Sequence, residues 1–142
     1  MNRRNKMVGT KNNRRAQLTK KNIQDALIHL MSDKNINSIS VTDICKTADI
    51  NRGTFYAHFV DVADCMNHME KETANELFSI LENDKQTDSV EVLLQAIFEL
   101  VKKNNKVFNF ILTEDQDFLA NIYLPQNRSF LTSLFQTTTH YQ

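Results

Sequence analysis

The stretch from Ser40 to Phe59, SVTDICKTADINRGTFYAHF, most constrains what this 142-residue chain can fold into. Ser40, with Asp43 three residues later, has the pattern of a capping box, which marks the start of a helix. The apolar residues that follow recur at spacings of three and four, which is typical of one helical face: Val41, Ile44, Cys45 and Ala48. The pattern predicts a short amphipathic helix that begins after Ser40.

A second helix is predicted directly after the first. Asn51 is the next capping residue, and Phe55 and Phe59 follow it one helical turn apart. Asp49 stands where the chain must turn, and aspartate tolerates left-handed backbone geometry better than most residues other than glycine. The segment is therefore interpreted as two short helices joined by a tight turn.

The leading turn of the second helix carries polar side chains that suit a nucleic acid. Asn51, Arg52 and Thr54 lie at its N-terminal end, where free backbone N–H groups and the helix dipole favour phosphate. Gly53 lacks a side chain where the backbone would approach DNA closely. The spacing alone leaves two interpretations open, a DNA-reading helix and a solvated helical hairpin within an ordinary bundle.

The sequence INRGTFYAHF, residues 50–59, resembles the signature of the TetR family of transcriptional regulators. The resemblance extends over about residues 18–69, with Ile23, Ala26, Leu27 and Leu30 similar to the family's first helix. Two positions depart from the pattern. Val62 stands where the family often has a phosphate-contacting lysine, and Cys65 where it usually has leucine.

The resemblance implies an all-α, TetR-like fold, with a three-helix DNA-binding domain joined by a long helix to a small helical bundle. It implies a basic arm at 1–17, a helix-turn-helix domain at 18–66 and a helical effector and dimerisation domain at 67–142, which is incomplete because the family's last two helices do not follow. The implied partners are double-stranded DNA, a small apolar effector and a second copy of the chain. By resemblance and position, the candidate DNA contacts are Thr42, Lys46, Asn51, Arg52, Gly53, Thr54, Tyr56 and His58.

The distribution of charge supports binding to a polyanion at one end. Residues 1–60 contain 11 Lys and Arg against 4 Asp and Glu, whereas residues 61–142 contain 6 against 13. A basic half attracts DNA and an acidic half repels it. The alternative is an ordinary bias in solvated surface charge.

The N-terminal residues 1–17 are rich in Arg and Lys and poor in apolar side chains, so we predict a disordered basic arm. Such an arm either follows DNA phosphates or only aids solubility. The first helix is predicted from a Thr19 cap to about Asp33, with Leu18 packing on Ile23 and a buried stripe after it. The core would be completed by further apolar residues: Ile36, Ile39, Val41, Ile44, Ala48, Ile50, Phe55 and Phe59.

Beyond the motif, the pattern predicts a long connecting helix from an Asp61 cap to about Leu81. A strongly amphipathic helix is predicted next, with apolar positions Val90, Leu93, Leu94, Ile97, Phe98 and Val101. Shorter helices are predicted at about 106–112, 114–124 and 126–136. Aromatic residues of this half could line a pocket for an apolar effector, although ordinary core packing is the more frequent role of such residues: Phe98, Phe108, Phe118 and Tyr123.

No catalytic motif is recognisable, so we predict a protein that is not an enzyme and that needs no cofactor. One group could suggest a metal ion, but it lacks paired-cysteine spacing, and we assign it structural or surface roles: His58, Asp61, Asp64, Cys65 and His68. The two cysteines lie far apart in the sequence, which predicts a reduced cytoplasmic protein without a disulfide scaffold. No apolar run approaches the roughly 20 residues of a membrane span, so we predict that the chain does not enter a membrane.

The sequence thus predicts a DNA-binding transcriptional regulator of TetR type. Of the two kinds of regulator, we predict a repressor that is released by a small effector, in preference to an activator. Val62 and the missing final helices leave an alternative open, a helical coactivator or partner protein that has lost independent DNA binding. A third interpretation is an effector-binding sensor without a regulatory role, which requires a deep pocket in the C-terminal half.

Overall fold

The computed structural model describes residues 3–83, 89–115 and 117, with only the backbone for residues 3–11 and 83. Its elements are α1 (Arg3–Leu30), the 3-10 turn η1 (Ile36–Ser38), α2 (Val41–Ala48), α3 (Arg52–Tyr56), α4 (Val62–Asn83), α5 (Val90–Lys103) and α6 (Asn105–Thr113). The described residues contain helices and no strands, which confirms the all-α prediction. The predicted helices at 114–124 and 126–136 lie almost wholly outside the described residues.

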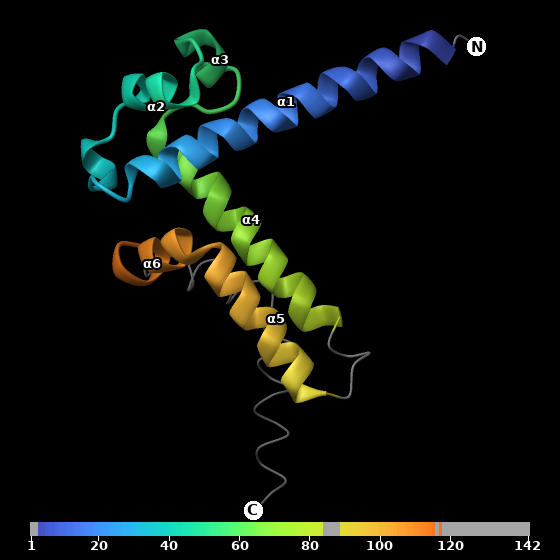
Figure 1. The fold of residues 1–142 in the computed structure, drawn as a ribbon, viewed down its shortest axis with the longest axis vertical. Coiled ribbons are helices and arrows are strands. Elements are labelled where there is room, and N and C mark those ends of the chain that lie inside the picture. The colour runs from blue at the N-terminus through green and yellow to red at the C-terminus, as the bar shows by residue number, and fades with distance from the viewer. Residues whose placement is uncertain (1–2, 84–88, 116, 118–142) are drawn as a thin grey trace, which may run out of the picture.

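The arrangement places α2 and α3 at one end of the molecule and the start of α5 at the other (Figure 1). Helix α1 crosses the beginning of α4, and α4 then runs beside α5 in the opposite direction. Helix α6 lies below the α1–α2 end and contacts α4. The connecting helix α4 has 22 residues, so it is roughly 33 Å long at 1.5 Å per residue and contacts both ends of the fold.

Helix α1 starts earlier than the sequence predicted. The Thr19 hydroxyl donates to the Arg15 carbonyl at 2.9 Å, so Thr19 lies inside a continuous helix and is not its cap. Leu18 is 62% exposed and does not pack as a staple. The residues predicted as a disordered arm are helical from Arg3. The prediction considered only burial, whereas a helix anchored by a buried segment can extend into solvent at little nucleation cost.

One core joins α1, the helix-turn-helix segment, α4 and α6. Ile23, Ala26 and Leu27 of α1 are buried as predicted, with Leu30 and Met31 packed against them. The same cluster receives Val107 and Ile111 from α6. The predicted core residues of the motif also belong to it, as buried or partly buried members: Ile36, Ile39, Val41, Ile44, Ala48, Ile50, Phe55 and Phe59. The proposed domain boundary at 66–67 therefore crosses a continuous core.

Helix α4 begins at the cap that the sequence predicted. The Asp61 carboxylate accepts a hydrogen bond from the Asp64 N–H at 2.7 Å, and the Asp64 carboxylate accepts one from the Val60 N–H at 2.9 Å. These reciprocal bonds satisfy two backbone donors at the helix start. None of the helices within the described ranges combines the length and the apolar character needed to cross a bilayer.

Helix α5 forms where predicted, but its apolar residues divide between two faces. Leu100 is 4% exposed, and Leu93 and Ile97 are half-buried. The other predicted apolar positions are exposed: Val90, Leu94, Phe98 and Val101. The periodicity identified an amphipathic helix, but it assigned to one buried face residues that spread over two.

Candidate nucleic-acid interface

Helix α2 is started by the predicted capping box. The Ser40 hydroxyl accepts from the Asp43 N–H at 3.1 Å, and the Asp43 carboxylate accepts from the Ser40 N–H at 3.0 Å. The hydrogen bonds with Ser40 hold the pKa of the Asp43 carboxyl below its ordinary value. Ile39, immediately before the cap, and Ile44 are both buried. These local interactions set the direction in which α2 leaves the preceding turn.

The turn between α2 and α3 depends on a left-handed residue. Asp49 has φ 53° and ψ 52°, and it is the one described residue other than glycine with a positive φ. The N–H of Asp49 and that of Ile50 both donate to the Cys45 carbonyl, which ends α2. This is the αL helix end that the sequence predicted at Asp49.

Helix α3 begins at Asn51, whose side-chain oxygen accepts from the Thr54 N–H at 2.8 Å and from the Thr54 hydroxyl at 3.1 Å. A Cβ at Gly53 would lie 3.3 Å from that same oxygen. Gly53 therefore leaves room for the Asn51 cap, a role in addition to the predicted close approach to DNA. Sequence reasoning missed this role because it depends on the side-chain rotamer of Asn51.

Two buried rings support α3 from below. Phe55 and Phe59 are 0% and 2% exposed, and their ring centroids lie 5.9 Å apart. Tyr56 packs edge-on against Phe55, with the two ring centroids 5.5 Å apart, although 49% of Tyr56 remains exposed. Because aromatic burial of this kind dominates small cores, these rings fix the position of α3 on the domain.

The Arg52 guanidinium joins α2 to α3 on the open surface. Its Nη1 donates to the Thr42 hydroxyl at 3.1 Å, and its Nη2 donates to the Tyr56 hydroxyl at 3.0 Å. Its Cζ lies 5.6 Å from the centre of the Tyr56 ring, within cation–π range. Three predicted contact residues are thereby brought together. The spacing of four between Arg52 and Tyr56 could have indicated half of this network, whereas Thr42 could not be found from sequence spacing.

The predicted contact residues differ in exposure. Thr54 and His58 are half-buried, and the His58 ring centroid lies 6.3 Å from that of Phe59. The remaining candidates are exposed: Thr42, Lys46, Asn51, Arg52, Gly53 and Tyr56. They lie at the α2–α3 end of the molecule, distant from the first turn of α5 (Figure 1). These six residues therefore form an exposed surface on α2 and α3.

The residues considered for a metal have other interactions. Cys65 is fully buried, and burial, followed by the charges of Asp64 and Glu72, raises the pKa of its thiol to about 12. The His68 Nδ1 lies 2.9 Å from the Asp64 carbonyl oxygen and 3.4 Å from a carboxylate oxygen of Asp64. Within the described ranges, no three His, Cys, Asp or Glu side chains are grouped to hold a metal ion.

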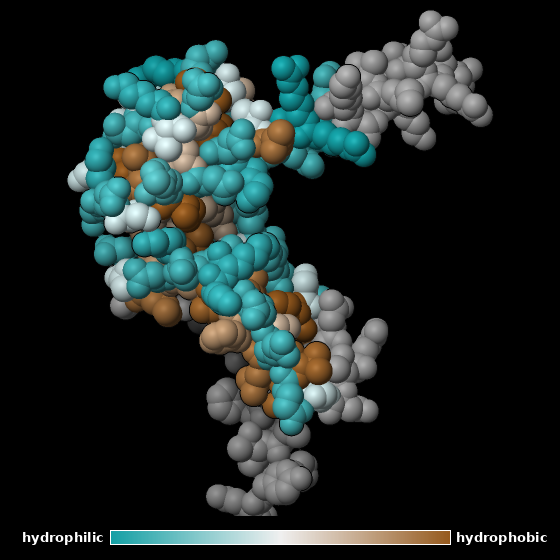
Figure 2. Space-filling view, in the orientation of Figure 1, coloured by the Kyte–Doolittle hydropathy of each residue, from teal (hydrophilic) through white to brown (hydrophobic). Residues whose placement is uncertain are grey.

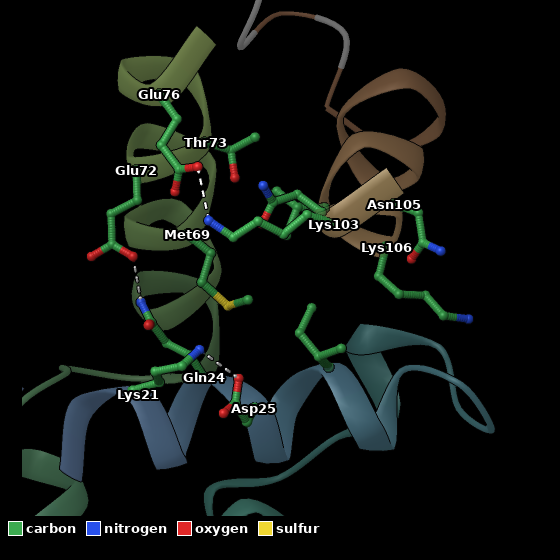
Figure 3. A pocket seen from close by; sticks show the side chains of 13 residues that line it. Lys21, Gln24, Asp25, Met69, Glu72, Thr73, Glu76, Lys103, Asn105 and Lys106 are labelled. Atoms are coloured by element: carbon green, nitrogen blue, oxygen red, sulfur yellow. Dashed lines mark hydrogen bonds and ion pairs between the residues drawn. The ribbon is translucent and has the colours of Figure 1, made fainter. Parts of the chain in front are cut away.

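Of the four residues predicted to line an effector pocket, Phe98 is 65% exposed and Phe108 is half-buried. Phe118 and Tyr123 lie outside the described residues. Two clefts are found elsewhere. One, of about 230 Å³, lies where α1, α4 and the α5–α6 junction meet. Figure 3 shows Gln24 and Lys103 reaching across it to α4, with Gln24 bonded to Glu72 at 2.9 Å and Lys103 to Glu76 at 3.0 Å.

The second cleft, of about 380 Å³, opens between the η1–α2 region, the start of α4, and α6. Its apolar lining includes Ile36, Ile39, Met66 and Phe110, and Asp115 lies at its wall. The sequence could not predict this cleft because its walls come from three segments that are separated along the chain, residues 36–41, 61–67 and 110–115.

A family model described as "Bacterial regulatory proteins, tetR family" matches residues 23–69, which contain this interface. The HTH-type transcriptional regulator AcrR of Shigella flexneri is 34% identical over 62 residues, which are 44% of this chain and 29% of the relative. The chain therefore spans less than a third of the length of that curated relative.

Two solved structures were matched by the comparison of folds. A transcriptional regulator of Aquifex aeolicus VF5, described as of the TerR/AcrR family, has a TM-score of 0.63 at 22% identity, over 87% of this chain and 86% of that one. The fatty acid degradation regulator FadR of Bacillus halodurans has a TM-score of 0.49 at 17% identity, over 80% of this chain and 57% of that one. The first of these confirms the TetR-like fold.

Proposed function

Through residues 23–69 this chain belongs to the TetR family of bacterial regulatory proteins, and we propose that it is a transcriptional regulator that binds duplex DNA through α2 and α3. The observation that carries the proposal is the exposed guanidinium of Arg52, held at the start of α3 by Thr42 and Tyr56. Arginine at the leading turn of a recognition helix suits bidentate contact with guanine in the major groove. As a regulator of bacterial DNA, the protein acts in the cytoplasm.

Exposed polar groups beside Arg52 support the proposal. Lys46 lies in the last turn of α2, and its exposed ammonium suits a DNA phosphate. Asn51 and Tyr56 are also exposed, whereas the apolar Phe55 and Phe59 point into the core. The surface is therefore polar where DNA would lie, and its shape is maintained by buried rings behind it. His58 and Thr54, which are half-buried, contribute at the edge of this contact.

The experiment selects bound fragments from genomic DNA, footprints the preferred site and measures affinity for that site and for random duplex. Arg52→Ala should weaken binding to the site by about 1 to 3 kcal/mol and reduce its preference over random duplex. Lys46→Ala should weaken both duplexes alike.

Lys71→Ala is the matched control, because Lys71 is also an exposed cation but lies on α4, outside the interface. Equal losses of affinity for the preferred site in Arg52→Ala and Lys71→Ala would show that Arg52 does not make the proposed base contact. A folded protein without preference for any fragment would favour the alternative of a helical partner protein.

We further propose that the protein is a repressor released by a small apolar effector. The cleft between the η1–α2 region and α6 supports this proposal, because a ligand there would touch the DNA-binding end and α6 at once. Its apolar side chains suit an apolar molecule. An apolar dye that fluoresces on burial tests the cleft: Ile36→Gln, at a half-buried residue of the lining, should reduce dye binding, whereas Phe98→Gln, at a residue outside this cleft, should not.

A further inference from the structure

The cleft where α1, α4 and the α5–α6 junction meet, which we call the polar cleft, has walls of opposite charge (Figure 3). Among its lining residues, α4 contributes the acids Glu72 and Glu76 and no base. The α5–α6 junction contributes the bases Lys103 and Lys106 and no acid. Helix α1 contributes one charge of each sign, and these two pair with each other. The polar cleft therefore differs from the exposed apolar surface that Figure 2 shows over α5 and the end of α4.

The start of α6 adds to the positive side of the polar cleft. Asn104 precedes α6 without a side-chain capping hydrogen bond, and Asn105 and Lys106 begin the helix at the wall of the cleft. The first N–H groups of a helix have no acceptor within that helix, and together with the helix dipole they favour an anion. Lys106 is half-buried and forms no ion pair with any residue that the structure describes. A carboxylate is therefore favoured on this side.

A buried hydroxyl on α4 lacks a partner at the same cleft. Thr73 is 4% exposed and belongs to the lining. Its hydroxyl forms no hydrogen bond within the described part of the chain, whereas the hydroxyls of Thr47 and Thr113 donate to backbone carbonyls four residues earlier. In Figure 3 the Thr73 hydroxyl points toward the Lys103 side chain, which crosses the cleft. Because buried polar groups are nearly always hydrogen-bonded, this hydroxyl indicates a bound molecule.

The ion pair that crosses the polar cleft can be exchanged. Lys103 and Glu76 lie 3.0 Å apart, and their side chains are 66% and 46% exposed. Exposed pairs of this kind contribute little to stability, so a ligand with two charges can separate them at small cost. An ammonium group would take the place of Lys103 beside Glu76, and a carboxylate would meet Lys103 and the start of α6. One ion pair is thereby replaced by two.

The volume and the apolar part of the lining limit the size of the ligand. The polar cleft, at about 230 Å³, is smaller than the roughly 300 to 1,000 Å³ of pockets that hold drug-sized molecules. Ile28, Met69 and Val107 also line it, and the last two are buried. A short aliphatic group would therefore find apolar contacts beside the charged groups.

We propose that the polar cleft binds a small α-amino acid with an aliphatic side chain. Its ammonium lies against the α4 carboxylates, and its carboxylate lies against Lys103 and the start of α6. This ligand differs from the apolar effector proposed for the second cleft, and none of the described residues lines both clefts. The site also uses none of the proposed DNA contacts. Its test therefore succeeds or fails independently of the proposed function.

A ligand-observed NMR titration of the full chain with L-valine tests the proposal. L-Valine should bind with a dissociation constant of about 1 to 10 mM, because the gain consists of one additional exposed ion pair, one hydrogen bond and a few apolar contacts. Isovalerate, which lacks the amine, and isobutylamine, which lacks the carboxylate, should bind at least tenfold more weakly, since each meets only one charged wall. The absence of saturable L-valine binding, or equal binding of either single-charge compound, would overturn the proposal.

Two pairs of variants locate the bound L-valine. Thr73→Val should weaken binding about fivefold through the loss of one hydrogen bond, whereas Thr113→Val, at an exposed threonine outside the cleft, should leave it unchanged. Lys103→Gln should weaken binding at least fivefold, and Lys102→Gln, at an exposed lysine of the same helix outside the cleft, should not. Thermal unfolding checks that each variant is folded. Equal losses within either pair would place L-valine elsewhere, and the proposal would then be wrong.

Discussion

The α2–α3 end of the molecule and helix α5 differ in how far their apolar side chains are exposed to solvent. At the α2–α3 end, Phe55 and Phe59 are almost fully buried, and the surface carries polar groups. On α5, Phe98 is 65% exposed, with Leu94 beside it at 60%. The first region has completed its packing within the chain. The second keeps an apolar face that the described residues leave open.

The largest expected effect tests whether the two phenylalanines differ as their burial indicates. Phe55→Ala should lower the free energy of unfolding by roughly 3 to 5 kcal/mol, because the ring is fully buried among other core side chains. Phe98→Ala should change it by about 0.5 kcal/mol or less in the monomer. Urea unfolding at low protein concentration measures both. Similar losses for the two variants would show that Phe98 is covered within the monomer.

The next prediction concerns Glu70, a buried carboxyl on α4, the helix that connects the two regions. It is fully buried, and neither of its oxygens has a hydrogen-bond partner among the described residues. Burial, followed by the charge of Asp115, raises the pKa of Glu70 from 4.5 to about 7. The folded state therefore holds a proton that the unfolded state releases as the pH rises above about 4.5.

Stability should fall as the pH rises through this window, and the full loss of up to about 3 kcal/mol is present above pH 7. Glu70→Gln has no charge to bury, so its stability should lack this part of the pH dependence. Urea unfolding of both proteins at pH 5 and pH 8 measures the difference, since groups common to both cancel. Parallel pH profiles for the two proteins would mean that Glu70 stays ionised with a partner in the folded state.

The sequence predicted well those features that depend on neighbouring residues. The caps at Ser40, Asn51 and Asp61 and the left-handed turn at Asp49 are confirmed, because each is a contact across two to four residues. The buried positions of the motif followed from the same short-range periodicity.

The predictions failed where the outcome depends on distant segments. Thr19 has a good capping side chain, but the helix passes through it because residues on both sides continue the backbone hydrogen bonds. The α5 periodicity predicted one apolar face, and only the packing of α4 and α6 determines which of its residues are covered. The network of Arg52 with Thr42 joins residues ten apart, so it required the angle between α2 and α3.

The residues that precede α2 and α5 allow a further comparison of the two regions, with a smaller expected effect. Ser40 caps α2 through reciprocal bonds with Asp43, whereas Ser89 precedes α5 without a side-chain capping bond. Ser40→Ala should therefore cost about 0.5 to 2 kcal/mol of unfolding free energy, and Ser89→Ala much less. Thermal unfolding of the two variants side by side provides the comparison. An equal cost at both positions would indicate that Ser89 also caps its helix in solution.

The smallest expected effect concerns how Arg52 is held, and it rests on the proposed DNA binding. Tyr56→Phe removes the hydroxyl that accepts from Arg52 but keeps the ring beside the guanidinium. Loss of one such hydrogen bond should weaken binding to the preferred DNA site by about 1 kcal/mol, or roughly fivefold, without changing stability. Thr42→Val removes the other acceptor and should act alike. Tighter binding by either variant would mean that the network keeps Arg52 from reaching DNA. Arg52 would then have to break its hydrogen bonds with Thr42 and Tyr56 before it could contact a base.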